Sequence, residues 1–168
     1  MGFWAARGMA MSAELSAELL AQALSRTLEE AAFVFAEPTQ DPPPLEGEVI
    51  EARLSYRGDH EGELRLAAPA SFAASLAANL LGEEEGSQGA KARGDDCIGE
   101  LLNMIAGALA VDLFGPGSRC LLGLPRVRRV AAEEHAQALA TAHAAATLIE
   151  EEGGRIDLSA SISQGASK

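Results

Sequence analysis

The stretch from Asp95 to Phe114 decides the fold, and it reads DDCIGELLNMIAGALAVDLF. Its large apolar residues recur at three- and four-residue steps, the period of an amphipathic helix with one buried stripe. They are Ile98, Leu101, Leu102, Ile105, Leu109 and Leu113. Asp95 or Asp96 can cap the start, and Gly115-Pro116-Gly117 ends the pattern. The sequence therefore predicts a long helix packed against a core.

The opposite face of this helix carries Asp96, Glu100, Asn103, Gly107 and Ala110, at steps of four, three, four and three. A carboxylate and a carboxamide thus lie one turn apart on the outer face. Asn and Gly are poor helix formers, costing roughly 0.7 and 1 kcal/mol relative to Ala. Their presence has two interpretations: an exposed face that tolerates any residue, or a face shaped to meet something else.

Part of this stripe, together with a later proline, carries a family resemblance. Asp96, Glu100 and Asn103, separated by three and two residues, and Pro125 resemble the motif of the CheC/CheX/FliY phosphatases of bacterial chemotaxis. The surrounding sequence GELLNMIAG is also similar to that family's motif helix. The family's spacing from Asn to Pro is about one residue longer than here, and a looser similarity runs from about residue 14 to 163.

CheC-type members usually carry a second motif on an earlier helix, and this chain has none. Each glutamate of the first predicted helix is followed three positions later by alanine or phenylalanine instead of asparagine. These glutamates are Glu14, Glu18, Glu29 and Glu30. The chain therefore resembles the single-motif, CheX-like branch.

The resemblance implies an α+β, CheC-like fold, with an antiparallel β-sheet packed with long α-helices. It also implies a hydrolase that removes the phosphoryl group from the phospho-aspartate of a response-regulator receiver domain such as CheY, in chemotaxis or related two-component signalling. By this resemblance Asn103 positions the attacking water and Glu100 pairs with a receiver lysine. No cofactor of the chain's own is expected, because the receiver supplies Mg²⁺.

Insertion of a helix into another domain's active site needs a slim leading face. Gly107 and Ala110 provide small side chains there, so we expect them to contact the partner. Asp96, one turn before Glu100, is interpreted as a cap or an orienting group at the same surface.

Two other classes of function remain open. The chain could be a binding or scaffold module that recognises a phosphorylated receiver but hydrolyses it slowly, as the shortened spacing to Pro125 suggests. It could also be an unrelated enzyme that uses Asp96 and Glu100 as paired carboxylates, which would need a pocket beside them.

Length and charge narrow the class of protein. At 168 residues, we expect one domain over residues 12–163, with a flexible N-terminus at 1–11 and a tail at 164–168. A net charge of −12 argues against nucleic acid as a partner. No apolar run is long enough for a membrane span, and the N-terminal run Phe3–Ala6 is too short for a signal peptide, so a cytoplasmic location is expected.

Cys97 and Cys120 each lie in an apolar run and form no Cys-x-x-Cys pair, so free buried thiols are expected. The histidines show no ligand spacing, and no metal site is predicted; they are His60, His135 and His143.

Before the motif helix, the pattern predicts a first helix from Ser12 to about Phe35 and a stiff connector from Glu37 to Pro44. Alternation then predicts a hairpin formed by Glu48–Tyr56 and Gly62–Ala67, with Glu51 outward. A short helix follows and ends at Gly82. The charged segment Glu83–Gly94 is interpreted as a solvated loop that could also touch a docked partner.

After the motif helix, strand pieces are predicted at Arg119–Leu124 and Val127–Val130. Four arginines there suit either an acidic partner or a solvated sheet edge; they are Arg119, Arg126, Arg128 and Arg129. Propensity favours helix for Gln137–Ile149, but the family topology favours a strand, and we predict a strand that pairs with Arg155–Ser163. Because one of the final strands should lie at a sheet edge, we also expect a homodimer.

Overall fold

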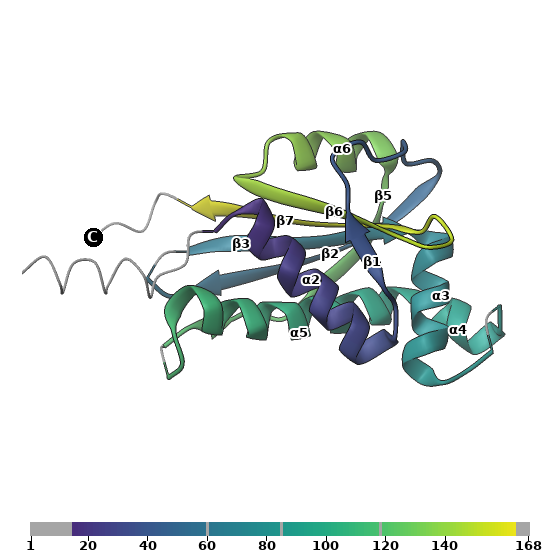
Figure 1. The fold of residues 1–168 in the computed structure, drawn as a ribbon, viewed down its shortest axis with the longest axis horizontal. Coiled ribbons are helices and arrows are strands. Elements are labelled where there is room, and N and C mark those ends of the chain that lie inside the picture. The colour runs from purple at the N-terminus through teal and green to yellow at the C-terminus, as the bar shows by residue number, and fades with distance from the viewer. Residues whose placement is uncertain (1–14, 60, 85, 118, 164–168) are drawn as a thin grey trace, which may run out of the picture.

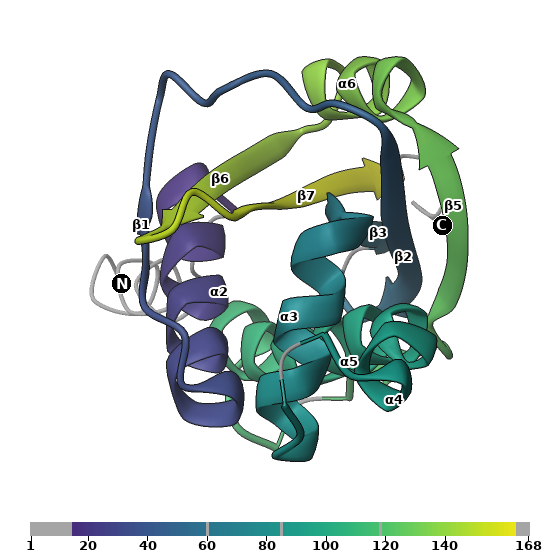
Figure 2. The ribbon, with the colours of Figure 1, turned by 90° about the vertical axis from the view of Figure 1, so that its right-hand side faces the viewer.

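The computed structural model describes residues 15–59, 61–84, 86–117 and 119–163. In this part of the chain, seven antiparallel strands form one sheet. Helices α2, α3 and α5 cover one face of the sheet, and α6 covers the other (Figures 1 and 2). The elements are α2 Ala17–Ala32, β1 Ala36–Pro38, β2 Glu48–Arg57, β3 Glu61–Pro69, α3 Ala70–Leu81, α4 Gln88–Ala92, α5 Gly94–Phe114, β4 Leu121–Leu122, β5 Arg126–Ala131, α6 Ala132–Ala140, β6 Ala144–Glu150 and β7 Arg155–Ser163. The predicted α+β fold is confirmed.

Helix α5 is the centre of the core, as its period predicts. The six apolar residues of its inner stripe are all buried, none more than 6% exposed. By length and composition α5 could also cross a membrane, but half of its apolar 18-residue stretch is buried inside the protein. A helix at the core of a globular domain has the same length and composition, and α5 packs as one here.

The predicted caps of α5 are right at one end only. Gly115 ends the helix with φ 84° and donates its N–H to the Val111 carbonyl. Neither Asp95 nor Asp96 caps the start: the N-cap residue is Arg93, and its side chain makes no capping hydrogen bond. Arg93 is also the C-cap of α4, so the predicted loop contains a short helix that leads directly into α5.

The first helix is shorter than predicted. Ser12 lies outside the described residues, and α2 begins after Ser16, whose hydroxyl accepts the Leu19 N–H at 3.1 Å. It ends at Ala32 because Phe33 adopts a left-handed conformation, with φ 55°. The chain then extends into β1, which pairs with β6, so the predicted connector begins as a strand.

The predicted β2–β3 hairpin is confirmed, but one of its outward-pointing side chains is buried instead of exposed. Glu51 points away from the main core, yet it is only 1% exposed. Helix α6 lies over that side of the sheet and excludes the solvent that alternation alone would predict. Asp157 on β7 is buried on the same side, also 1% exposed.

The alanine-rich segment was predicted wrongly in its first half. Residues Ala132–Ala140 form α6, as helix propensity favoured, and the strand β6 begins only at Ala144. The hairpin of β6 with β7 is confirmed.

The order of strands is β1-β6-β7-β3-β2-β4, with β5 also pairing with β2. The final strands β6 and β7 therefore both lie inside the sheet, and the expectation that one of them lies at an edge is wrong. The edges are β1 on one side and β4 with β5 on the other, and Figure 2 shows β1 and β5 at opposite sides of the sheet. The two predicted strand pieces around Pro125 are these short β4 and β5.

Candidate functional site

The outer stripe of α5 lies at the surface, as its spacing predicts. Asp96, Glu100, Asn103 and Gly107 are exposed, and Ala110 is half-buried. Glu100 and Asn103 make no hydrogen bond or ion pair with any residue that the structure describes. A Cβ added to Gly107 would meet nothing within 4 Å, so no other described part of the chain lies against it. A carboxylate and a carboxamide are therefore free to meet another molecule.

A groove of about 620 Å³ lies beside this stripe. Its walls come from the end of α3, the first half of α5 and the segment that joins β4 to β5. The residues that line it are Ala77, Leu80, Leu81, Arg93, Asp96, Cys97, Gly99, Glu100, Asn103, Leu124, Pro125 and Val127. All four motif residues line this groove; they are Asp96, Glu100, Asn103 and Pro125.

Pro125 lies close to the motif helix because α5 packs closely against the start of β5. A Cβ added to Gly99 would lie 3.1 Å from Val127 Cγ2 and 3.7 Å from Pro125 Cβ. The absence of a side chain at Gly99 thus lets α5 approach the strand, and Asn103 follows one turn later. The Asn–Pro spacing, shorter than the family's, still brings both residues to one groove.

Arg129 joins the start of α5 to the sheet. Its guanidinium donates to Asp95 Oδ1 at 2.9 Å and to Glu48 Oε1 at 2.7 Å. These hydrogen bonds, that to Asp95 first, raise the pKa of Arg129 above its usual value. Asp95 is thereby paired within the chain, whereas Asp96 and Glu100 remain as carboxylates of the groove.

The arginines near Pro125 do not all form a solvated edge. Arg128 donates to the buried Glu51 at 3.2 Å and to Glu134 at 2.6 Å. Together with the bridge made by Arg129, this contact fixes β5 to β2 and α6. Two of the four arginines that were expected at an acidic partner or a solvated edge therefore form ion pairs within the chain.

Cys97 lies in the groove wall but is a poor nucleophile. Burial raises the pKa of its thiol to about 12, so it stays protonated at neutral pH. Both cysteines are free, as predicted, although Cys120 is half-buried instead of buried. Among the described residues, no group of three or more His, Cys, Asp or Glu side chains could hold a metal ion.

The geometry leaves little room for chemistry by the chain alone. A groove does lie beside Asp96 and Glu100, as the paired-carboxylate alternative requires, but it is lined mainly by apolar side chains. An exposed carboxamide can orient a water molecule, and an exposed carboxylate can bind a cation. The arrangement suits a reaction whose reactive group is brought by a partner.

Among the groove residues outside the motif, which sequence reasoning did not assign to the site, three are exposed. Leu124 is 87% exposed and Leu81 is 41% exposed, and neither belongs to the motif. Arg93 lies three residues before Asp96, so the stripe's own spacing extends to it. An apolar residue directly before the motif proline was the available signal for Leu124.

The antiparallel sheet, its long core helix and the Glu100–Asn103 stripe define a protein of the CheC-like class. The sequence from residue 50 to 148 matches the family described as chemotaxis phosphatase CheX, and the chain belongs to this family. The comparison with curated proteins finds no match.

Solved structures agree with this assignment. The chemotaxis protein CheX from Desulfovibrio desulfuricans has a TM-score of 0.63 at 18% identity, covering 88% of this chain and 98% of that one. The CheX of a CheX–CheY–BeF3–Mg²⁺ complex from Borrelia burgdorferi gives 0.64 at 18% identity, with 88% and 97% covered. Thermotoga maritima FliY gives 0.59 at 13% identity, with 88% and 87% covered. At these identities the likeness concerns the fold.

Proposed function

We propose that this protein hydrolyses the phospho-aspartate of a response-regulator receiver domain of the CheY type. The observation that carries the proposal is the exposed pair Glu100 and Asn103, one turn apart and unpaired within the described chain. The family supports it, and the complex that the Borrelia burgdorferi CheX forms with CheY supports a receiver as the partner.

An acyl phosphate is already activated, so its hydrolysis needs positioning more than acid–base chemistry. Asn103 holds a water molecule in line with the phosphorus atom. Its carboxamide donates to and accepts from water without the negative charge that would repel phosphoryl oxygens. The Asn103 side chain is therefore the catalytic group of the reaction.

Glu100 forms an ion pair with a lysine of the receiver and so keeps the two active surfaces in register. Asp96 adds a second carboxylate to the same surface, and Gly107 and Ala110 let the helix approach closely. The Mg²⁺ of the reaction arrives with the receiver, as the composition of the Borrelia burgdorferi complex suggests. This chain then contributes no metal ligand.

The test is the release of phosphate from CheY-type receivers phosphorylated in the presence of Mg²⁺. Asn103→Ala should lower the turnover rate by about a hundredfold or more, the scale for losing a positioned reactant. Its melting temperature should not fall, because Asn103 is exposed and unpaired. Gln22→Ala, which removes an exposed carboxamide from α2, is the matched control and should leave turnover unchanged.

A folded Asn103→Ala protein with full turnover would refute the role of Asn103. Tight binding of the phosphorylated receiver by the wild type without turnover would instead favour the binding-module alternative.

A further inference from the structure

Three of the eight large apolar side chains that are exposed in the described part of the chain lie around the motif. Leu124, Leu81 and Met104 are 87%, 41% and 38% exposed, in a chain of net charge −12. Leu124 and Leu81 line the groove that contains Asn103, and Met104 follows Asn103 on α5. Apolar side chains that cluster at a functional groove mark an interaction surface.

The residues that line the groove are suited to bind an apolar side chain. The small side chains of Cys97 and Ala77 line the groove between its walls, and Gly99 lets Val127 and Pro125 lie close against α5. The walls consist of Leu80 and Leu81 on one side and of Leu124 and Val127 on the other. Motif carboxylates lie only along the α5 rim.

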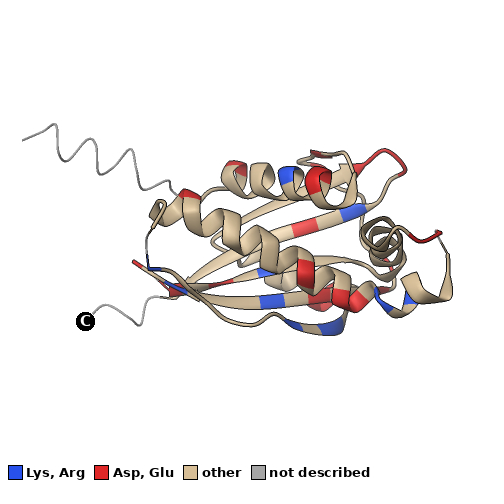
Figure 3. Ribbon diagram, turned by 90° about the horizontal axis from the view of Figure 1, so that it is seen from below, with Lys and Arg blue, Asp and Glu red and all other residues tan. Residues whose placement is uncertain are grey.

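The charged residues around the groove determine which partner can approach it. Figure 3 shows acidic residues near both ends of α5, three of the four at its start, whereas the turns from Leu101 to Val111 carry no charge. Arg93 lines the groove close to this acidic end, is exposed, and forms no ion pair with a described residue. Arg129, by contrast, is occupied by Asp95 and Glu48. Among the described residues that line the groove, Arg93 is therefore the free cation beside the apolar walls.

We propose that this groove receives an apolar side chain which the receiver presents next to its phosphorylated aspartate, flanked by a carboxylate that meets Arg93. Leu124 is the main anchor of the contact and sets the affinity for the receiver. This inference rests on the proposed function, and it adds a binding surface that the four-residue motif does not contain. Anchors of this kind, rather than the whole contact area, carry most of the energy of an interface.

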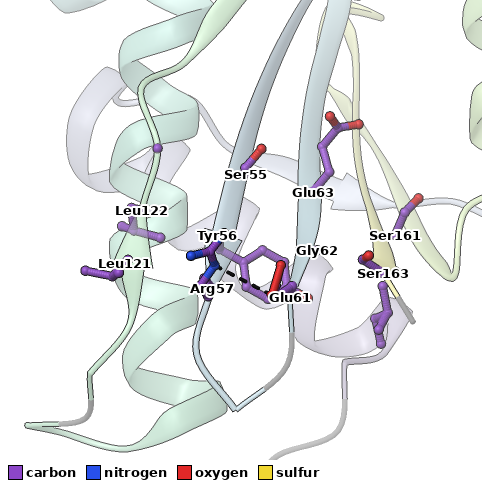
Figure 4. Close-up of a pocket in the computed structure, with 12 residues that line it drawn as sticks. Ser55, Tyr56, Arg57, Glu61, Gly62, Glu63, Leu121, Leu122, Ser161 and Ser163 are labelled. Atoms are coloured by element: carbon purple, nitrogen blue, oxygen red, sulfur yellow. Dashed lines mark ion pairs between the residues drawn. The ribbon is translucent and has the colours of Figure 1, made fainter. Parts of the chain in front are cut away.

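The experiment compares Leu124→Ser with Leu121→Ser. Leu121 is also exposed, at 67%, but lines a different hollow, at the end of the sheet that holds the β2–β3 turn (Figure 4). Steady-state dephosphorylation of a CheY-type receiver and titration with the same receiver bound to beryllofluoride and Mg²⁺ are measured for both variants. Melting temperatures check that each variant is folded.

Leu124→Ser should raise KM and Kd about tenfold or more, the scale for losing a buried apolar anchor, while kcat changes less than twofold. Leu121→Ser should change neither constant. Arg93→Gln should raise Kd a few-fold and reduce its dependence on salt, as expected for a charge at the rim of an interface.

An unchanged KM and Kd in folded Leu124→Ser, or an equal effect of Leu121→Ser, would overturn the inference. A fall in kcat at constant KM would overturn it as well, because Leu124 would then not act through affinity. The beryllofluoride titration separates this inference from the proposed catalysis. If the wild-type protein binds the receiver without turnover and Leu124→Ser binds it more weakly, the groove is supported and the phosphatase is refuted.

Discussion

Asn103 and Glu100 lie one turn apart on α5 and differ in whether their side chains carry charge. Positioning a water depends on hydrogen bonds and geometry, so added salt should affect the Asn103 step weakly. An ion pair between Glu100 and a partner's lysine is a Coulomb interaction, which salt screens over about 10 Å at 0.1 M. The two residues should therefore have different kinetic signatures.

We expect Glu100→Gln to weaken the productive complex about three- to tenfold, because a carboxamide keeps the shape but removes the charge that pairs with lysine. Raising the salt concentration should weaken the wild-type complex in the same direction and affect the variant less. Receiver titrations at several salt concentrations measure both effects. Glu29→Gln on α2, also exposed, makes the same change in net charge and serves as control. Full activity of Glu100→Gln together with salt-independent wild-type binding would contradict this role.

At the scale of residues, sequence was enough to predict the motif face and not enough to predict its surroundings. A helical period fixes which side chains lie on one face, so Glu100 and Asn103 could be placed outward from spacing alone. The groove depends on contacts between segments far apart in the chain. Leu124 lines the groove beside α5 only because β5 pairs with β2, and Asp95 is paired only because Arg129 comes from that strand.

At the scale of elements, the exposed face of α5 gives a test that needs no knowledge of the partner's residues. Gly107→Gln should raise the free energy of unfolding by up to roughly 1 kcal/mol, because Gly is a poor residue in a helix interior. The space around Gly107 is open, so no internal clash opposes this gain. If the face enters a receiver, the long side chain must collide with it, and binding and turnover should be lost together.

Gly107→Ala is the matched control for that variant. It should give a similar gain in melting temperature with a much smaller loss of turnover, because a methyl group adds little bulk. A Gly107→Gln protein that is more stable and fully active would show that this part of α5 does not approach the partner.

Helix α6 is held on the sheet by a buried polar cluster. His135 of α6 is 2% exposed, and its Nε2 lies 2.6 Å from Asp157 Oδ2. Asp157 also accepts from Thr147 Oγ1 at 2.7 Å and from the Arg155 guanidinium at 3.0 and 3.1 Å. Burial opposes the charged carboxylate, but the hydrogen bonds from His135, Arg155 and Thr147 outweigh it and hold the pKa of Asp157 below its usual value.

This cluster makes stability depend on pH in one direction. Because the folded pKa of Asp157 is lowered, its contribution is fully present above the unfolded value of about 3.9 and is lost as pH falls through the lower folded value. Asp157→Asn should cost about 3 kcal/mol near pH 7, the scale for breaking a buried ion pair, and should flatten the acid side of the stability curve. Denaturant unfolding from pH 7 to 3 measures both. Asp112→Asn, a half-buried carboxylate of α5 with no ion pair in the described chain, should do neither.

Elements with a clear hydrophobic period were predictable, and the others were not. The hairpin of β2 and β3 and the helices α3 and α5 all bury one regular stripe. Helix α6 is rich in alanine and buries little besides His135, so its sequence shows no stripe of large apolar residues. The family topology therefore led to a predicted strand, although helix propensity had correctly favoured a helix. Without α6 in place, alternation could not indicate that Glu51 and Asp157 would be buried.

At the scale of the whole molecule, the two edges of the sheet differ in how readily they could pair with another copy. Strand β5 carries Arg126, Arg128 and Arg129 and follows Pro125. Charged side chains and a nearby proline make an edge strand a poor template for a second strand, so this edge discourages association. The opposite edge is the short β1, which carries only one charged residue, Glu37.

Two exposed phenylalanines come directly before β1. Phe33 and Phe35 are 76% and 67% exposed, and they are two of the five phenylalanines in the chain. Phe33 also adopts φ 55°, a conformation that a bulky L-residue reaches only at some cost in energy. Folding of a single chain therefore gives little reason for a phenylalanine at this position.

We expect the protein to be a homodimer in which this edge and its two phenylalanines face a second copy. Light scattering at tens of micromolar should then give about twice the chain mass of 17.4 kDa. The variant Phe33→Gly with Phe35→Ser should be a monomer that melts no lower than expected for a single chain, because glycine adopts a positive φ without the steric penalty and Phe35 contributes little to the core. Leu121→Ser, which removes an exposed leucine near the other edge, should remain a dimer. A wild-type mass of one chain would reject the dimer, and a double variant that still associates would place the contact elsewhere, with the arginine-rich β5 edge as the next surface to test.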